Sequence, residues 1–174
     1  MTTPEQQWLA NRPDGPYRVL GTGSQTWDDP VAVRDTLALV WHPAATLVLG
    51  ACPRGGDRMM EDCWTHWGGQ IELHPADWAG RCQLDCPGGH RRTNRRGDDY
   101  CPRAGMVRNL RMVHLGAAVC VSLIRDQSPG ASQCTDWARA AGILVIERTS
   151  PATEGAGREA TGSTGRPDSR LGDV

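Results

Sequence analysis

The feature that most constrains the fold of this chain is a regular alternation of short apolar segments with longer helical ones. Apolar runs that predict strands lie at 17–24, 45–51, 70–76, 117–126 and 143–148. Strands that alternate with helices form a parallel sheet whose two faces the helices cover. The sequence therefore predicts an α/β, three-layer fold with roughly five parallel strands.

The chain has a different composition on either side of this pattern and in one segment within it. Residues 1–16 are expected to form a polar N-terminal arm, and residues 17–148 the folded domain. Residues 149–174 are rich in Gly, Thr, Ser and Pro, which predicts a disordered tail. Residues 79–104 have no apolar periodicity and many Gly, Arg and Cys residues, so we expect an irregular insert within the domain.

Composition excludes several classes of protein. The net charge of −1 gives no general basic field for nucleic acid, and no stretch approaches the roughly 20 apolar residues of a membrane span. Seven cysteines without an export signal predict a cytoplasmic protein with reduced thiols. All 19 basic residues are arginine, and lysine and phenylalanine are absent. This bias indicates a G+C-rich bacterial or phage genome, and it excludes chemistry that needs a lysine.

Small residues follow several predicted strands, at the edge where parallel sheets bind their ligands. Backbone N–H groups at a helix N-terminus favour an anion, and glycine lets a ligand approach the backbone. One such turn can be purely steric, but several at one edge predict a phosphate site. The expected ligand contacts are Gly23, Ser24 and Gln25 in the first turn, Gly50, Gly55, Gly56 and Asp57 in the second, and Ser128, Gly130 and Ala131 in the last.

Arg108, Asn109 and Trp27 complete the predicted ligand site. An arginine and an asparagine near a helix start suit a phosphate or a ribose hydroxyl. Trp27 could stack on a base, or it could instead close one end of the core. The turn GTGSQT lacks the third glycine of a dinucleotide fingerprint, and there is no lysine for a P-loop. The NAD-dehydrogenase and P-loop NTPase classes are therefore excluded.

Asp57, with Glu61 one helical turn further on, is the candidate catalytic carboxylate. Such a group could activate water during cleavage of an N-glycosidic bond. An aspartate at the head of a helix is commonly a cap, however, so a cap or a ribose contact is favoured over a general base. Cys52 is a candidate nucleophile near a helix start, without an obvious histidine partner. We expect binding rather than catalysis.

The insert contains Cys82, Cys86, His90 and Cys101 in the pattern C-x₃-C-x₃-H-x₁₀-C. Three thiolates and an imidazole can close a tetrahedral structural zinc site, and a segment without its own core often needs such a staple. Free thiols and a disulfide are the alternatives. The basic run at 90–96 could cover the mouth of the ligand pocket, contact nucleic acid or form a solvated loop.

Together these motifs resemble the SLOG superfamily, which is related to the Smf/DprA proteins and the Lonely Guy enzymes. The nearest branch is the YspA/YpsA-related group, common in actinobacteria and their phages. The resemblance covers residues 18–147, and it rests on the stretches GTGSQTW, GACPRGGD, HPADW, RAGMVRNLRM and IRDQSPGASQCTDWARAAGI. Gln25 stands where the branch usually has an arginine. The glutamate motif of the Lonely Guy enzymes is not identifiable, so their activity is not inherited.

The resemblance implies a Rossmann-like domain that binds a nucleotide or nucleotide-derived small molecule, often as a homo-oligomer. It assigns Gly23 and Ser24 to the first ligand loop, Gly50, Gly55 and Asp57 to the second, Arg108 and Asn109 to an Arg-Asn pair, and Ser128 and Gly130 to the last loop. The expected role is a sensor or sequesterer, for example of a signalling or immune second messenger. The alternatives are a nucleotide-processing hydrolase, and a nucleic-acid-binding accessory protein that uses the arginine-rich insert.

Overall fold

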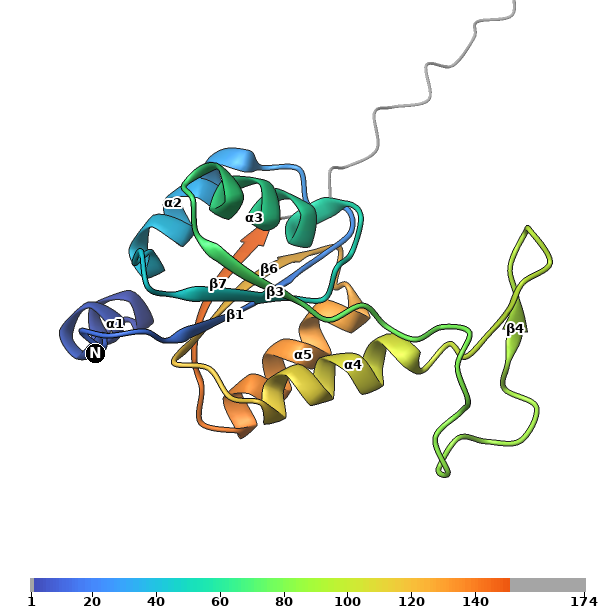
Figure 1. The fold of residues 1–174 in the computed structure, drawn as a ribbon. Helices are drawn as coiled ribbons and strands as arrows, with labels where there is room; N and C mark the ends of the chain where they lie inside the picture. Colours follow the sequence, from blue (N-terminus) through green and yellow to red (C-terminus); the bar gives the residue numbers. More distant parts are fainter. Residues whose placement is uncertain (1, 151–174) are drawn as a thin grey trace, which may run out of the picture.

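The computed structural model describes residues 2–150, which form a five-stranded, all-parallel sheet with helices on both faces (Figure 1). The strands are β1 (Arg18–Gly23), β2 (Thr46–Leu49), β3 (Gln70–Leu73), β6 (Val119–Arg125) and β7 (Leu144–Ser150). Their order across the sheet is β3-β2-β1-β6-β7. The predicted α/β fold is confirmed, and the order of the strands reverses between β1 and β6.

The helices α2 (Pro30–Val40) and α3 (Gly55–His66) cover one face of the sheet, and α4 (Ala104–His114) and α5 (Pro129–Ala140) cover the other (Figure 1). Successive strand residues point to opposite faces, so each face has its own core. Leu47 and Leu49 of β2 pack with α2 and α3, whereas Val48 between them packs with α4 and α5. This burial on both faces explains why the strands are continuous apolar runs.

An additional helix, α1 (Pro4–Asn11), lies in the segment that the sequence analysis described only as a polar arm. The side chains of Thr3 and Gln6 form a reciprocal capping box at its start. Trp8 is buried, and its Nε1 donates a hydrogen bond to the Leu39 carbonyl at 2.9 Å. The N-terminal segment is therefore attached to the domain through α2.

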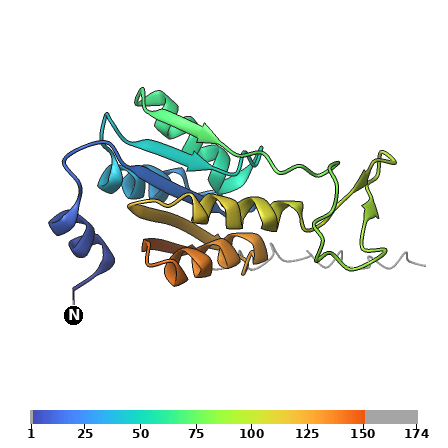
Figure 2. The same cartoon turned by 60° about the horizontal axis from the view of Figure 1, so that its bottom comes forward.

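The insert at 79–104 is irregular, as predicted, except for a short antiparallel hairpin of β4 (Arg92–Thr93) and β5 (Asp99–Tyr100). Figures 1 and 2 show this hairpin extending well beyond the end of the sheet. The last strand continues through Ser150, so Thr149 and Ser150 belong to the sheet rather than to the predicted tail. The remainder of the tail, 151–174, lies outside the described residues. Within 2–150, no helix combines the length and apolar character needed to cross a membrane.

Candidate functional site

A cavity of about 400 Å³ lies where the strand order reverses, at the carboxyl ends of β1 and β6. The loops after these two strands diverge because their helices lie on opposite faces of the sheet, which leaves a crevice between them. Residues after β1, the start of α3, the middle of α4 and the loop between β6 and α5 line it. We call this cavity the crevice.

Most of the predicted ligand contacts line this crevice. Those that line it are Gly23, Gln25, Asp57, Arg108, Asn109, Ser128, Gly130 and Ala131. Gly50 lines an adjoining cavity. Ser24, Trp27, Gly55 and Gly56 line neither cavity.

Ser24 and Gly56 hold the loops together instead of facing the crevice. The Ser24 hydroxyl accepts from the Arg125 N–H at 2.8 Å and donates to the Arg125 carbonyl at 2.9 Å. The Gly56 N–H donates to the Ser24 carbonyl at 3.0 Å. A Cβ on Gly23 would lie 2.6 Å from the Gly56 Cα, and Gly55 has a φ of 67°. The steric explanation therefore applies to these glycines, which permit backbone contact between the first two turns.

Trp27 lies in the core and does not reach the crevice, so the expected base contact is corrected. It is 3% exposed and packs with the α2 and α3 side chains. Its Nε1 donates to the Asp29 carbonyl at 3.1 Å. Asp29 also caps α2, accepting from the N–H groups of Val31 and Ala32. Trp27 thus closes the core below the first turn of α2.

Asp57 is buried at the base of the crevice. Its Oδ1 accepts from the Gly23 N–H at 3.0 Å. Burial raises the pKa of Asp57 to about 6, although the Arg108 charge and backbone N–H groups, including those of Gly50 and Cys52, favour the ionised form. Its carboxyl group therefore connects the turns that follow β1 and β2.

Of the two candidate catalytic carboxylates, Asp57 lines the crevice and Glu61 does not. Glu61 lies 3.7 Å from Arg58 on the outer side of α3. The second carboxylate at the crevice is that of Asp126, which the sequence analysis missed. Asp126 and Gln127 both have a positive φ, of 54° and 49°, which is uncommon for residues other than glycine. The backbone is strained at this edge of the crevice.

Arg108 and Asn109 form a connected pair. Arg108 Nε donates to Asn109 Oδ1 at 2.7 Å, and Asn109 Nδ2 donates to the Gly130 carbonyl at 3.2 Å. Arg108 Nη1 donates to the His74 carbonyl at 3.0 Å, but no acceptor within 2–150 engages its Nη2. A Cβ on Gly50 would lie 2.2 Å from Arg108 Nη1. Glycine is needed there to admit the guanidinium, whose pKa is lowered by burial.

The N-terminus of α5 leaves donors available to the crevice. Ser128 is its N-cap residue, but no side chain caps the helix. Gly130 and Ala131 line the crevice, and their backbone N–H groups have no partner in the part of the chain that is described. Unpartnered N–H groups at this end of a helix favour an anion.

Gln25 lies beside a guanidinium, although the resemblance leads one to expect an arginine at this position. Its Oε1 accepts from Arg54 Nε at 3.0 Å and from Arg54 Nη2 at 2.7 Å. The second turn thus places a positive charge next to the first.

A second cavity, of about 520 Å³, adjoins the crevice and shares Gln25, Arg108 and Gly130 with it. Pro75, Met106 and Trp78 are among its lining residues, and we call it the apolar cleft. Trp78 is 47% exposed, and a Cβ on Gly105 would lie 2.9 Å from its ring. The glycine lets the start of α4 pack closely against this indole.

The four predicted metal ligands lie together in the insert. Their ligand atoms all lie within 4.8 Å of one another, so the group of Cys82, Cys86, His90 and Cys101 could hold a metal ion. His90 Nε2 is 3.2 Å from the Cys101 Sγ and 3.5 Å from the Cys82 Sγ. His90 Nδ1 is 2.6 Å from the Pro87 carbonyl. Because that nitrogen must carry the proton, the Nε2 lone pair faces the sulfurs, as in a metal site.

Arg91 supports this cluster, and the rest of the basic run does not reach the crevice. Its guanidinium donates to the Gly80 carbonyl at 2.8 Å, pairs with Asp99, and lies 3.5 Å from the Cys82 Sγ. Hydrogen bonds to the Cys82 and Asp99 side chains both raise the pKa of Arg91. The other arginines of the run, Arg92, Arg95 and Arg96, are absent from the lining of the crevice and the apolar cleft. This run therefore does not cover the mouth of the crevice.

The sequence of this chain is similar to that of the Gene 61 protein of Mycobacterium phage D29. The two are 34% identical over 138 residues, which span 74% of this chain and 94% of the phage protein. The chain belongs to the same family as this phage protein. No protein-family model matches the chain, and no solved structure matches it significantly. The Gene 61 relative agrees with a phage or bacterial origin, and membership of the SLOG superfamily stays a prediction.

Two residues that the sequence analysis missed could have been predicted, because parallel sheets bind ligands at the carboxyl ends of their strands. Arg125 is the last residue of β6, Asp126 follows it directly, and both line the crevice. Trp78 also follows β3, within HPADW, and it lines the apolar cleft. The base contact was predicted for Trp27, which lies nearer to the glycine turn in the sequence but is buried in the core.

We expect Asp57→Asn to remove a pH dependence from the stability of the protein. Because the pKa of Asp57 is raised to about 6 in the folded state, the carboxyl group contributes stability below its ordinary pKa of 3.8 and loses that contribution as the pH rises through about 6. The free energy of unfolding of the wild type, relative to that of Asp57→Asn, should therefore fall by about 3 kcal/mol between about pH 4 and pH 8. Urea denaturation at a series of pH values measures this difference.

The matched control is Asp62→Asn, an exposed change on the same helix that retains Asp57 and should keep the wild-type trend. A difference between wild type and Asp57→Asn that does not vary with pH contradicts the proposed environment of Asp57.

Proposed function

We propose that this protein binds a nucleotide or nucleotide-derived small molecule in the crevice and the apolar cleft, as a sensor or sequesterer. The observation that carries the proposal is the joining of two kinds of surface. The crevice offers unpartnered backbone N–H groups at the start of α5 together with the Arg108 guanidinium. The adjoining cleft offers apolar walls and a half-exposed tryptophan. A molecule with an anionic group and a flat base matches both surfaces.

The phosphate position is supported by donors from two elements. The N–H groups of Gly130 and Ala131 lie at the positive end of the α5 dipole. Arg108 lines the same crevice from α4, and the orientation of its guanidinium is held by Asn109 and the His74 carbonyl. A phosphate there gains charge-assisted hydrogen bonds without any need to reorder the guanidinium.

Trp78 is the proposed stacking partner of the base. Aromatic side chains stack on any nucleobase, and a large apolar side chain that is nearly half exposed beside a cavity is available for such a contact. Asp57, at the base of the crevice, suits a ribose hydroxyl, which would donate to its carboxyl group.

Binding is favoured over hydrolysis because Asp57 already has a structural task. Its carboxyl group accepts backbone hydrogen bonds from the turns after β1 and β2. General acid–base catalysis needs a group that is free to exchange a proton with the substrate, and Glu61 lies outside the crevice. The alternative function is an N-glycosidase-like hydrolase that uses the raised pKa of Asp57. Release of free base from a bound nucleotide would support that alternative.

The SLOG assignment belongs to this proposal, together with the homo-oligomer and cytoplasmic location expected with it. The position of the crevice at the strand reversal, and the Arg108–Asn109 pair beside it, support the assignment. Nucleic-acid binding through Arg92, Arg95 and Arg96 is the remaining alternative, and a steep loss of affinity with salt would indicate it.

We further propose that the Cys/His cluster binds a structural zinc ion. Three thiolates and one imidazole with its Nε2 directed at the sulfurs form a zinc ligand set. Four protein ligands leave no open position for a reacting water, so the ion would order the insert rather than take part in a reaction.

Trp78→Ala should weaken nucleotide binding about tenfold or more, because a stacking contact to the base is lost. Isothermal titration with ADP and ADP-ribose measures this effect. Trp78→Phe keeps an aromatic surface and should stay within a few-fold of the wild type. Leu84→Ala, an exposed change elsewhere in the insert, is the control and should bind like the wild type. Equal affinities of Trp78→Ala and wild type would overturn the placement of the base.

Zinc should be present in the purified protein at about one ion per chain, as measured by elemental analysis in the presence of a thiol reductant. Cys86→Ser should lose the metal, because it removes one ligand of the cluster. Cys63→Ser changes a cysteine on α3, outside the cluster, and should retain it. Metal-free wild type in which the three cysteines of the cluster are reduced would contradict the zinc site.

A further inference from the structure

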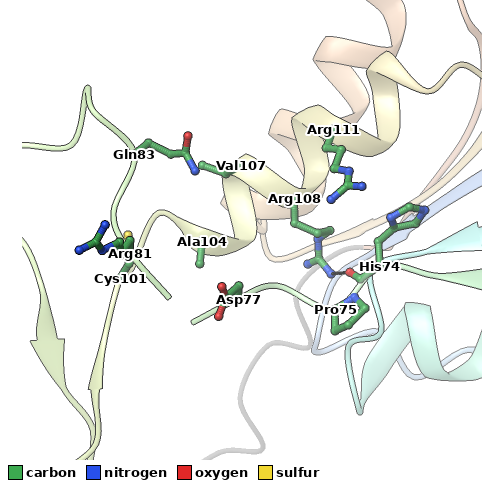
Figure 3. Close-up of a pocket in the computed structure, with 10 residues that line it drawn as sticks. All are labelled: His74, Pro75, Asp77, Arg81, Gln83, Cys101, Ala104, Val107, Arg108 and Arg111. Carbon is green, nitrogen blue, oxygen red and sulfur yellow. Dashed lines mark hydrogen bonds between the residues drawn. The ribbon is translucent and has the colours of Figure 1, made fainter. Parts of the chain in front are cut away.

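A third cavity, of about 220 Å³, also reaches Arg108 (Figure 3). His74 and Asp77 line it from the segment after β3, Arg108 and Arg111 from α4, and Arg81 from the insert. Figure 3 shows Arg108 and Arg111 extending from the same side of α4, with Arg81 across the cavity. We call this cavity the arginine groove.

The arginine groove carries an excess of positive charge. Arg81, Arg108 and Arg111 form no ion pair with a carboxylate among residues 2–150. The other described arginines without such a pair, Arg12, Arg54, Arg92, Arg95 and Arg96, do not line this cavity. Asp77 is the one carboxylate that lines the groove, and its Oδ1 already accepts from the Gly80 N–H at 2.9 Å. In a chain of net charge −1, unpaired guanidiniums gathered around one cavity indicate an anion as its occupant.

One wall of the groove is made by the Cys/His cluster itself. Cys101 lines the groove, and Arg81 and Gln83 lie on either side of Cys82. The Cys101 N–H also donates to the Trp78 carbonyl at 2.9 Å, which joins the two ends of the insert. The position of Arg81 therefore depends on how the cluster is held together.

We infer that the arginine groove binds a second phosphate-type oxyanion of the ligand, and that the folded Cys/His cluster is required for this subsite. The inference rests on the proposed function, because Arg108 lines the crevice, the apolar cleft and the groove alike. A ligand that fills all of these cavities carries anionic groups on both sides of this guanidinium. The ligand class is then a nucleotide with two separate phosphate positions, rather than a nucleoside monophosphate.

The test titrates inorganic phosphate into protein saturated with ADP, and phosphorus NMR monitors the binding of the phosphate. With ADP in the crevice and cleft, added phosphate reports on the groove alone. The wild type should bind phosphate, and Arg111→Ala should weaken this about tenfold or more, because a charge-assisted contact is lost. Arg111 lines the groove but neither the crevice nor the cleft, so this variant should bind ADP like the wild type.

The matched control is Arg95→Ala, which removes an exposed guanidinium from the hairpin and should leave phosphate binding unchanged. Equal phosphate affinities of Arg111→Ala and wild type, or no phosphate binding by the ADP-loaded wild type, would overturn the subsite and leave the proposed function intact. Failure of ADP and of a panel of other nucleotides and ADP-ribose derivatives to bind would instead overturn the proposed function, and phosphate titrated alone would then test the groove.

Cys86→Ser tests the dependence on the cluster, because Cys86 is a candidate ligand that does not line the groove. Cys86→Ser should keep ADP binding and lose phosphate binding. The loss should be about as severe as in Arg81→Ala, a variant that removes the guanidinium on the same wall of the groove. Circular dichroism establishes that both variants keep the α/β domain. Phosphate binding by Cys86→Ser at the wild-type level would exclude a role for the cluster.

Discussion

The contact between Gly23 and the first turn of α3 is the constraint on which the rest of the site depends. The absence of a Cβ at Gly23 and Gly56 lets the two backbones meet. Across this contact the Gly23 N–H donates to the Asp57 carboxyl group, and the Gly56 N–H donates to the Ser24 carbonyl. The Gly23 and Gly56 N–H groups are used in this contact, so they are not available to a phosphate. The crevice opens instead toward the loop after β6, where the start of α5 keeps its N–H groups unpartnered among the described residues.

Arg108 links the parts of the site that this contact creates. It is partly buried beside Gly50, and burial disfavours its charge while the nearby Asp57 carboxylate favours it. For Asp57, burial likewise disfavours the charged form and Arg108 favours it, so the pKa of Asp57 is raised where that of Arg108 is lowered. An anion near Arg108 would improve this balance for the guanidinium and worsen it for Asp57, so in the proposed binding mode the phosphate lies toward α5 and the ribose toward Asp57. Trp78, just before the insert, and Arg81 within it line the cavities that adjoin the crevice.

Periodicity predicted the fold because sheet and helix burial leave strong, local patterns, as in the apolar run of β2. The Cys/His cluster was predictable for a similar reason, since its members are close in sequence. Glycine patterns could not separate Gly56, which serves backbone packing, from Gly130, which faces the crevice. Nor could sequence decide between Trp27 and Trp78, because only the three-dimensional arrangement shows which indole is covered by the core.

The most direct test of the central claim is native mass spectrometry of the protein purified from its host, followed by denaturation and identification of whatever is released. The account predicts a bound nucleotide derivative, recovered chemically intact and carrying more than one phosphate. A protein that carries no ligand, and whose thermal stability is unchanged by a panel of nucleotides and ADP-ribose derivatives, would contradict it.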